Sequence, residues 1–69
     1  MAVCYNKLFL LMTERKIRYT DLLSDAAISG NVMTRIKRNE YISMESLEKI
    51  CSALNCKIDD ILDFVEEVQ

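Results

Sequence analysis

Turn-forming residues are nearly absent from this chain: its 69 residues include one Gly and no Pro. A sandwich or barrel of many strands needs a turn signal about every 8–12 residues, and Gly and Pro supply most of those signals. Hydrophobic residues make up 51% of the chain, which is enough for a core and argues against intrinsic disorder. We therefore expect one all-α domain that spans residues 1–69.

The three cysteines are Cys4, Cys51 and Cys56, and the chain contains no His. We expect no metal site and no cofactor, because a structural zinc site takes four ligands and three thiols cannot complete it. Cys51 and Cys56 are expected to pack as small hydrophobic side chains. The apolar run over residues 8–12 is too short for a membrane span, which needs about 20 apolar residues, and its flanking charges do not suit a secretory leader. A reducing, cytoplasmic location is therefore expected.

Hydrophobic spacing predicts five helices joined by short links. The first covers residues 5–16, and the fourth runs from its cap Ser43 to Asn55, which can close it in a left-handed conformation. The last is expected over about residues 58–66. Its apolar side would consist of four residues: Ile58, Ile61, Leu62 and Val65.

The two short helices in the middle form the most informative part of the pattern. Thr20 is expected to cap the second helix, and Ser29 is expected to cap the third, which covers about residues 30–38. The link between them, Ala27-Ile28-Ser29, contains an apolar residue that can be held in the turn. Two short helices at this spacing are typical of a helix–turn–helix.

The third helix has a polar face opposite Met33 and Ile36. This face contains cationic and hydrogen-bonding groups and no carboxylate: Asn31, Thr34, Arg35 and Arg38, with Lys37 at its border. Arg can form two hydrogen bonds with guanine and Asn two with adenine, so the face suits base edges and nearby phosphates. A solvated helix face is the alternative interpretation, and the helix–turn–helix setting favours nucleic acid over it.

The charge distribution supports this interpretation, although the whole chain has a formal charge of −2. Residues 1–40 contain seven cations and four anions, whereas residues 41–69 contain two cations and seven anions, so the two parts carry +3 and −5. Charges more than about 10 Å apart are largely screened at moderate salt. A polyanion would therefore respond to the local positive potential near the third helix.

Several short segments carry a pattern that is known from other proteins. They are Thr20-Asp21-Leu22, Ala26-Ala27-Ile28-Ser29, Ser43-Met44-Glu45, Leu47-Glu48-Lys49-Ile50-Cys51, Ala53-Leu54-Asn55-Cys56 and Asp60-Ile61-Leu62. On these segments, from Tyr5 to about Phe64, the chain resembles the small stand-alone Cro/CI-type (lambda-repressor-like) helix–turn–helix regulators of bacteria, their phages and mobile elements. The resemblance implies a five-helix DNA-binding domain whose third helix lies in the major groove.

The resemblance also implies roles for individual residues. Gly30, Asn31 and Arg35 match the positions that read bases in the family, and Gly30 leaves the discrimination to the other two. Residues at positions that contact phosphates or flanking bases are Thr20, Ser29, Thr34 and Arg38. Lys37, at the border of the polar face, is expected to make a contact of the same kind. Ala27 occupies a turn position that is usually Gly, where a left-handed backbone costs Ala on the order of 1 kcal/mol.

We therefore expect a sequence-specific transcriptional regulator, with repression as its action, that binds a palindromic or near-palindromic DNA operator as a homodimer. Candidates for the dimer surface are three apolar residues, Leu10, Phe64 and Val65, and packing within the fold is the alternative role of each. The alternative is a protein-interaction module, such as an antirepressor or adaptor, which the acidic C-terminal third favours. An enzyme is not expected, because the chain has no His, no Gly-rich phosphate loop and no thiol with an evident base partner. No membrane and no small-molecule ligand are expected as partners.

Overall fold

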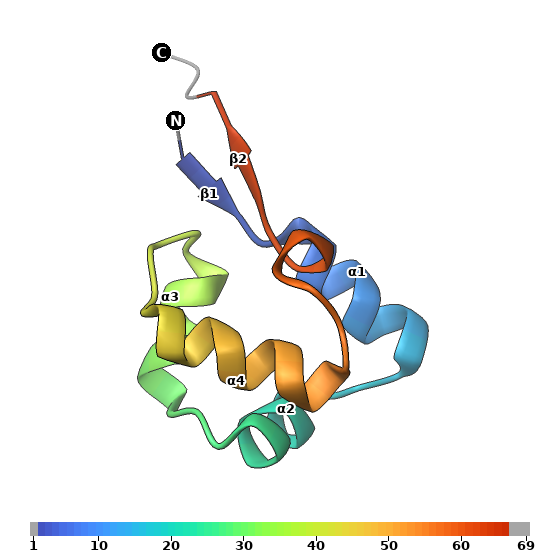
Figure 1. Ribbon diagram of the computed structural model, residues 1–69. Helices are drawn as coiled ribbons and strands as arrows, with labels where there is room; N and C mark the ends of the chain where they lie inside the picture. Colours follow the sequence, from blue (N-terminus) through green and yellow to red (C-terminus); the bar gives the residue numbers. More distant parts are fainter. Residues whose placement is uncertain (1, 67–69) are drawn as a thin grey trace.

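Four α-helices surround a hydrophobic core in the computed structural model, which describes residues 2–66 (Figure 1). The elements follow one another as β1 (Ala2–Cys4), α1 (Asn6–Arg15), α2 (Tyr19–Ala26), α3 (Gly30–Lys37), α4 (Met44–Leu54), the 3₁₀ helix η1 (Ile58–Asp60) and β2 (Asp63–Val65). The buried side chains are Val3, Tyr5, Leu8, Met12, Leu22, Ala26, Met33, Ile36, Leu47, Ile50, Leu54, Ile61 and Leu62. Within the described residues, no helix is long and apolar enough to cross a membrane.

Side-chain caps fix the start of α3 and α4 at the predicted residues. The Ser29 hydroxyl oxygen accepts a hydrogen bond from the Val32 amide (3.4 Å), and the Ser43 hydroxyl oxygen accepts one from the Ser46 amide (3.1 Å). Each bond satisfies an amide that has no partner within its own helix. Asn55 ends α4 in the left-handed conformation (φ 52°), as predicted.

The predicted cap of α2 is wrong. The helix begins at Tyr19 with Arg18 in the cap position, so Thr20 lies inside the first turn. The Asp21 carboxylate accepts a hydrogen bond from the Arg18 amide (3.2 Å), and it also pairs with the Arg18 guanidinium (3.3 Å). This contact holds the pKa of Asp21 below its usual value. An acidic residue in the third helical position has therefore fixed a start that cap preferences alone do not predict.

The predicted fifth helix over residues 58–66 is also wrong, so the fold is mostly helical rather than all-α. Helical structure stops after the single turn of η1, and Asp63–Val65 pairs antiparallel with Ala2–Cys4, with Phe64 opposite Val3. The spacing of the apolar residues is compatible with a helix. A partner strand about 60 residues away in the sequence offers backbone hydrogen bonds that this local spacing does not reveal.

Tyr5 joins this small sheet to the rest of the fold. Its amide donates a hydrogen bond to the Asn39 side-chain oxygen (3.1 Å), and its hydroxyl donates one to the Glu40 carbonyl oxygen (2.7 Å). Burial, assisted by the nearby Tyr41, raises the pKa of Tyr5. Asn39 and Glu40 follow α3, so these two bonds fix the C-terminal end of α3 against the start of α1.

Candidate nucleic-acid interface

The link between α2 and α3 is a three-residue turn. Ala27 has φ 54° and ψ 45°, which is the left-handed conformation expected from its position. The Ile28 amide donates to the Leu23 carbonyl oxygen (3.2 Å), and the Ile28 side chain is half-buried against the core. The turn therefore has a fixed geometry and sets the direction in which α3 leaves α2.

The orientation of α3 is fixed by its apolar side. Met33 (3% exposed) and Ile36 (fully buried) lie in the core, and Val32 is half-buried beside them. The predicted site residues are all exposed: Thr20, Ser29, Gly30, Asn31, Thr34, Arg35, Lys37 and Arg38. Helical spacing places Asn31, Thr34, Arg35 and Arg38 together on the face of α3 that points away from the core. Thr20 lies on a different helix, in the first turn of α2.

The polar side chains of this face differ in the hydrogen bonds and ion pairs that they form within the protein. Thr34 donates its hydroxyl to the Gly30 carbonyl oxygen (3.0 Å) within the helix. One Arg38 guanidinium nitrogen lies 4.0 Å from a Glu40 carboxylate oxygen, in an exposed pair that is worth little in water. Within residues 2–66, Arg35 forms no ion pair. Arg35 is therefore the cation of α3 whose charge is most available to a ligand.

Lys37 is held toward α2 by a contact that was not predicted. Its ammonium nitrogen lies 4.4 Å from the centre of the Tyr19 ring, and Tyr19 in turn packs edge-on against Phe9 with 6.2 Å between ring centres. Cation–π attraction of this kind depends on the position of the ring over the charge. Tyr19 is thus a positioning residue for Lys37, and no periodicity in the sequence points to it, because the contact joins two helices.

The N-terminal end of α3 is open. Among residues 2–66, and apart from the backbone of its own helix and its two neighbours, a Cβ atom on Gly30 would meet no atom within 4 Å, and Gly30 itself has no positive φ. The glycine is therefore required neither by the turn nor by packing within the chain. It leaves room for another molecule to approach the first turn of α3, where helix geometry favours an anion.

The three residues predicted for a dimer surface are exposed but do not lie together. Phe64 borders an apolar hollow beside α4, whereas Leu10 lines a separate, largely charged cleft on α1. Val65 is the neighbour of Phe64 in β2, so its side chain points to the opposite face of the sheet. The exposed fractions are 64% for Leu10, 58% for Phe64 and 44% for Val65.

Two short helices around a tight turn, with a cationic outer face on the second, define a helix–turn–helix domain. Residues 7–67 match the family described as the Cro/C1-type HTH DNA-binding domain, and the chain belongs to that family. Its structure is similar to a crystal structure of the transcriptional regulator VanUg, with a TM-score of 0.91 and 32% sequence identity. The similarity covers 96% of this chain and 88% of the VanUg chain. No match was found among curated protein sequences.

Proposed function

We propose that the protein is a sequence-specific transcriptional regulator that represses genes by placing α3 in the major groove of its operator. The observation that carries this proposal is the outer face of α3. That face presents Asn31 and Arg35 to solvent, and the helix is fixed in direction by its buried side and its turn. Its family membership and its similarity to a transcriptional regulator agree with this proposal.

In the proposed complex, Arg35 and Asn31 read bases. Arg35 is free of ion pairs within the described residues, so its guanidinium can form two hydrogen bonds with guanine, and Asn31 can form two with adenine. Gly30 contributes no side chain and allows the backbone to lie close to the DNA. The residues proposed for phosphates and flanking bases are Thr20, Ser29, Thr34, Lys37 and Arg38.

We further propose that the protein binds as a homodimer to a palindromic or near-palindromic operator. The chain is short, and domains of about this size bury a smaller share of their surface than larger ones do, so association adds stability. Two α3 helices that read the same side of the duplex require half-sites about one helical turn, or roughly 34 Å, apart.

The experiment is a selection of binding sites from random double-stranded DNA, followed by titrations at two salt concentrations. Arg35→Ala should weaken binding to the selected site by about 1–3 kcal/mol and relax the preference at one base pair. Arg38→Ala should weaken binding to all sequences similarly and reduce the salt dependence. Lys57→Ala is the matched control, because Lys57 is an exposed cation outside α2 and α3; it should leave selectivity unchanged.

A protein-interaction module is the second candidate function, and the acidic character of residues 41–69 favours it. The same selection separates the two candidates. Folded protein that enriches no sequence, and that binds DNA from its own genetic neighbourhood without selectivity, would refute the regulator and favour the interaction module.

A further inference from the structure

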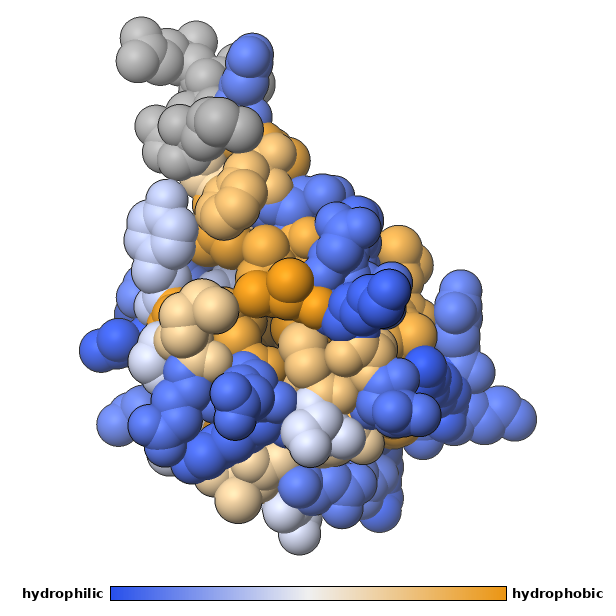
Figure 2. Space-filling view, in the orientation of Figure 1, coloured by the Kyte–Doolittle hydropathy of each residue, from blue (hydrophilic) through white to orange (hydrophobic). Residues whose placement is uncertain are grey.

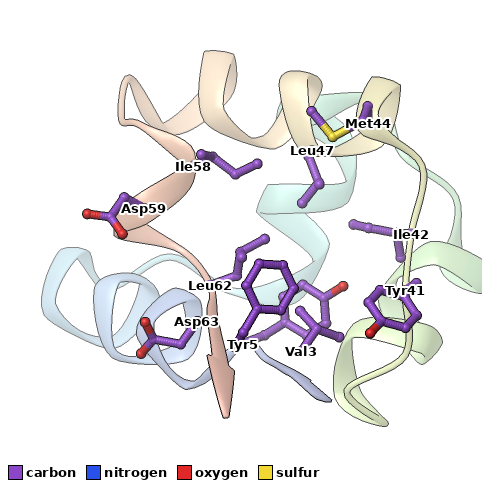
Figure 3. A pocket seen from close by; sticks show the side chains of 11 residues that line it. Val3, Tyr5, Tyr41, Ile42, Met44, Leu47, Ile58, Asp59, Leu62 and Asp63 are labelled. Atoms are coloured by element: carbon purple, nitrogen blue, oxygen red, sulfur yellow. The ribbon is translucent and has the colours of Figure 1, made fainter. Parts of the chain in front are cut away.

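An apolar hollow of about 370 Å³ lies between the two-stranded sheet, η1 and the start of α4. None of its lining residues belongs to the proposed DNA interface. Its floor is formed by buried side chains: Val3, Tyr5, Leu47 and Leu62. Figure 2 shows apolar surface gathered around the hollow, between the strands and α4, with hydrophilic residues at its edge. Figure 3 shows Tyr41 and Met44 on one side of it and Ile58 on the other.

The edge of this hollow contains most of the large hydrophobic side chains that the fold leaves exposed. Of seven such side chains within residues 2–66, four border it: Tyr41 (66% exposed), Met44 (70%), Ile58 (40%) and Phe64 (58%). A side chain of this size presents about 150–250 Å², so the four exposed fractions correspond to roughly 350–600 Å². Single exposed apolar residues are normal, whereas these four are gathered at one place, in a patch about as large as the largest apolar patch of a typical monomer, which is often functional.

The apolar surface continues along α4. A second hollow shares Met44, Leu47 and Ile58 with the first and extends to Cys51. On the other side, the carboxylates of Asp59 and Asp63 lie 3.9 Å and 3.2 Å from the Lys7 ammonium nitrogen. A partner that covers the hollow therefore meets carboxylates that already have a counter-charge, and the desolvation cost at that edge is reduced.

We propose that a second copy of this chain covers the hollow in a two-fold symmetric dimer. This inference rests on the proposed function, because it names the partner with which the regulator would bind a two-part operator. In such a dimer the same surface of both copies is in contact, so it must contain both protruding and concave parts. The hollow meets this condition, since the exposed side chains of Tyr41, Met44 and Phe64 stand beside it and can enter the hollow of the other copy.

The location of the hollow fits a dimer on DNA. Tyr41 lies in the link between α3 and α4, and Tyr5 of the hollow bonds to Asn39 and Glu40, so the hollow lies near the C-terminal end of α3. None of the residues that line it belongs to the Asn31–Arg35 face. The molecule measures 36 × 23 × 18 Å. These dimensions are of the same order as the roughly 34 Å repeat of the half-sites.

If fully covered, the four apolar side chains supply about half to three-quarters of the area per partner in a standard protein interface, which is roughly 800 Å². A polar rim supplies the remainder in such interfaces. The cleft that contains Leu10 is a weaker competitor, because four of its other lining residues carry charge: Lys7, Glu14, Arg15 and Asp60. Of the three residues predicted for the dimer surface, Phe64 is the one that this inference retains.

The test is sedimentation equilibrium of the full chain and of two matched variants, Met44→Glu and Leu10→Glu. Each variant adds one carboxylate at an exposed apolar position. Met44 is the first residue of α4, where the helix dipole favours an acidic side chain, so Met44→Glu should fold as well as the wild type. Circular dichroism checks the fold of both variants, and Phe64→Ser provides a second variant on a different element.

The expected result is a wild-type dimer whose dissociation constant rises at least about 100-fold in Met44→Glu, because the symmetric contact would bury two new charges. Phe64→Ser should weaken the dimer as well, and Leu10→Glu should change the constant less than about twofold. A wild-type chain that stays monomeric, both alone and on DNA with two half-sites, would overturn the inference. A dimer that Leu10→Glu disrupts and Met44→Glu leaves intact would also overturn it.

These outcomes are separate from those of the DNA selection. A monomer that still selects a half-site refutes the dimer and leaves the sequence-specific regulator standing. A dimer that Met44→Glu disrupts, but that selects no DNA sequence, confirms the contact surface and refutes the regulator.

Discussion

Replacing Ala27 by Gly is expected to stabilise the domain. Ala27 ends α2 with φ 54° and ψ 45°, where its Cβ atom crowds the backbone. Gly adopts the same conformation without that crowding. The side chain of Ala27 is exposed, so its removal takes no apolar group out of the core.

The size of the effect is a balance of two terms. Left-handed geometry costs an L-residue about 1–2 kcal/mol, and Gly relieves this cost in the folded state. Gly also gives the unfolded chain more freedom, which offsets the gain by about 0.4–1 kcal/mol. The net increase in the free energy of unfolding should be about 0.5–1 kcal/mol. In a domain of this size, that change raises the melting temperature by about 2–8 °C.

Urea unfolding followed by circular dichroism measures this change, and two other glycine variants provide the comparison. Asn55→Gly relieves a residue at φ 52°, but Asn tolerates left-handed geometry, so the gain should be smaller than at Ala27. Ser24→Gly lies inside α2 on its exposed side, and it should lower stability by about 0.5 kcal/mol.

One pattern of results would refute the reasoning. If Ala27→Gly and Ser24→Gly lowered stability equally, with an unchanged dependence on urea, position 27 would behave as ordinary helix and its geometry would not be left-handed. Selective DNA binding should survive Ala27→Gly within about twofold, because the turn keeps its direction.

Two further predictions concern the N-terminal segment. Tyr5→Phe should lower stability by about 0.5–1.5 kcal/mol, because the Glu40 carbonyl oxygen loses its donor. Burial raises the pKa of Tyr5 above its ordinary value of 10.0, so its contribution is complete below about pH 10 and declines as the pH rises further, where the unfolded chain loses the proton first. Urea unfolding at about pH 8 and about pH 11 should show a smaller alkaline loss in Tyr5→Phe, and an equal loss would contradict this assignment. Val3→Ala should lower the free energy of unfolding by about 1.5–2.5 kcal/mol, because Val3 is buried and β1 pairs with β2. Unchanged urea unfolding would mean that residue 3 lies outside the core.

The helix ends that were predicted correctly are those fixed by interactions between residues close in the sequence. Ser29 and Ser43 each accept a bond from an amide three residues away, and Asn55 takes up its own left-handed conformation, so each signal acts within one turn. Over residues 58–66 the deciding interaction joins Phe64 to Val3, which no local pattern contains.

The start of α2 shows a second limit of local patterns. Arg is a poor cap by residue type, whereas Thr20 is a good one. The carboxylate of Asp21 nevertheless bonds the amide of Arg18 and satisfies one of the free donors of the helix, so the helix starts at Tyr19, one residue before the predicted cap. The identity of a cap thus depends on which side chain bonds which amide, and composition does not decide it.

The candidate site was predicted in part for the same reason. Periodicity assigns residues to the outer face of α3, because Met33 and Ile36 determine which side is buried. Periodicity does not reveal that Lys37 lies over Tyr19, because that contact depends on how α2 packs against α3. It does not reveal that Arg38 lies near Glu40 either, because that contact depends on the path of the chain after α3.

The folded arrangement of charge explains how a chain with a net charge of −2 can suit DNA. Of the six cations outside residues 30–38, three lie in exposed ion pairs: Lys7 with Asp59 and Asp63, Arg18 with Asp21, and Lys49 with Glu45. Such pairs bring little net attraction to phosphates, so they should add little to the salt dependence of non-specific binding. In the proposed complex, selectivity depends on the few contacts of α3 in each copy. A dimer doubles those contacts without adding a cation to either chain. Because only the dimer makes both sets of contacts, the dissociation constant of the dimer through the hollow would set the protein concentration at which an operator is occupied.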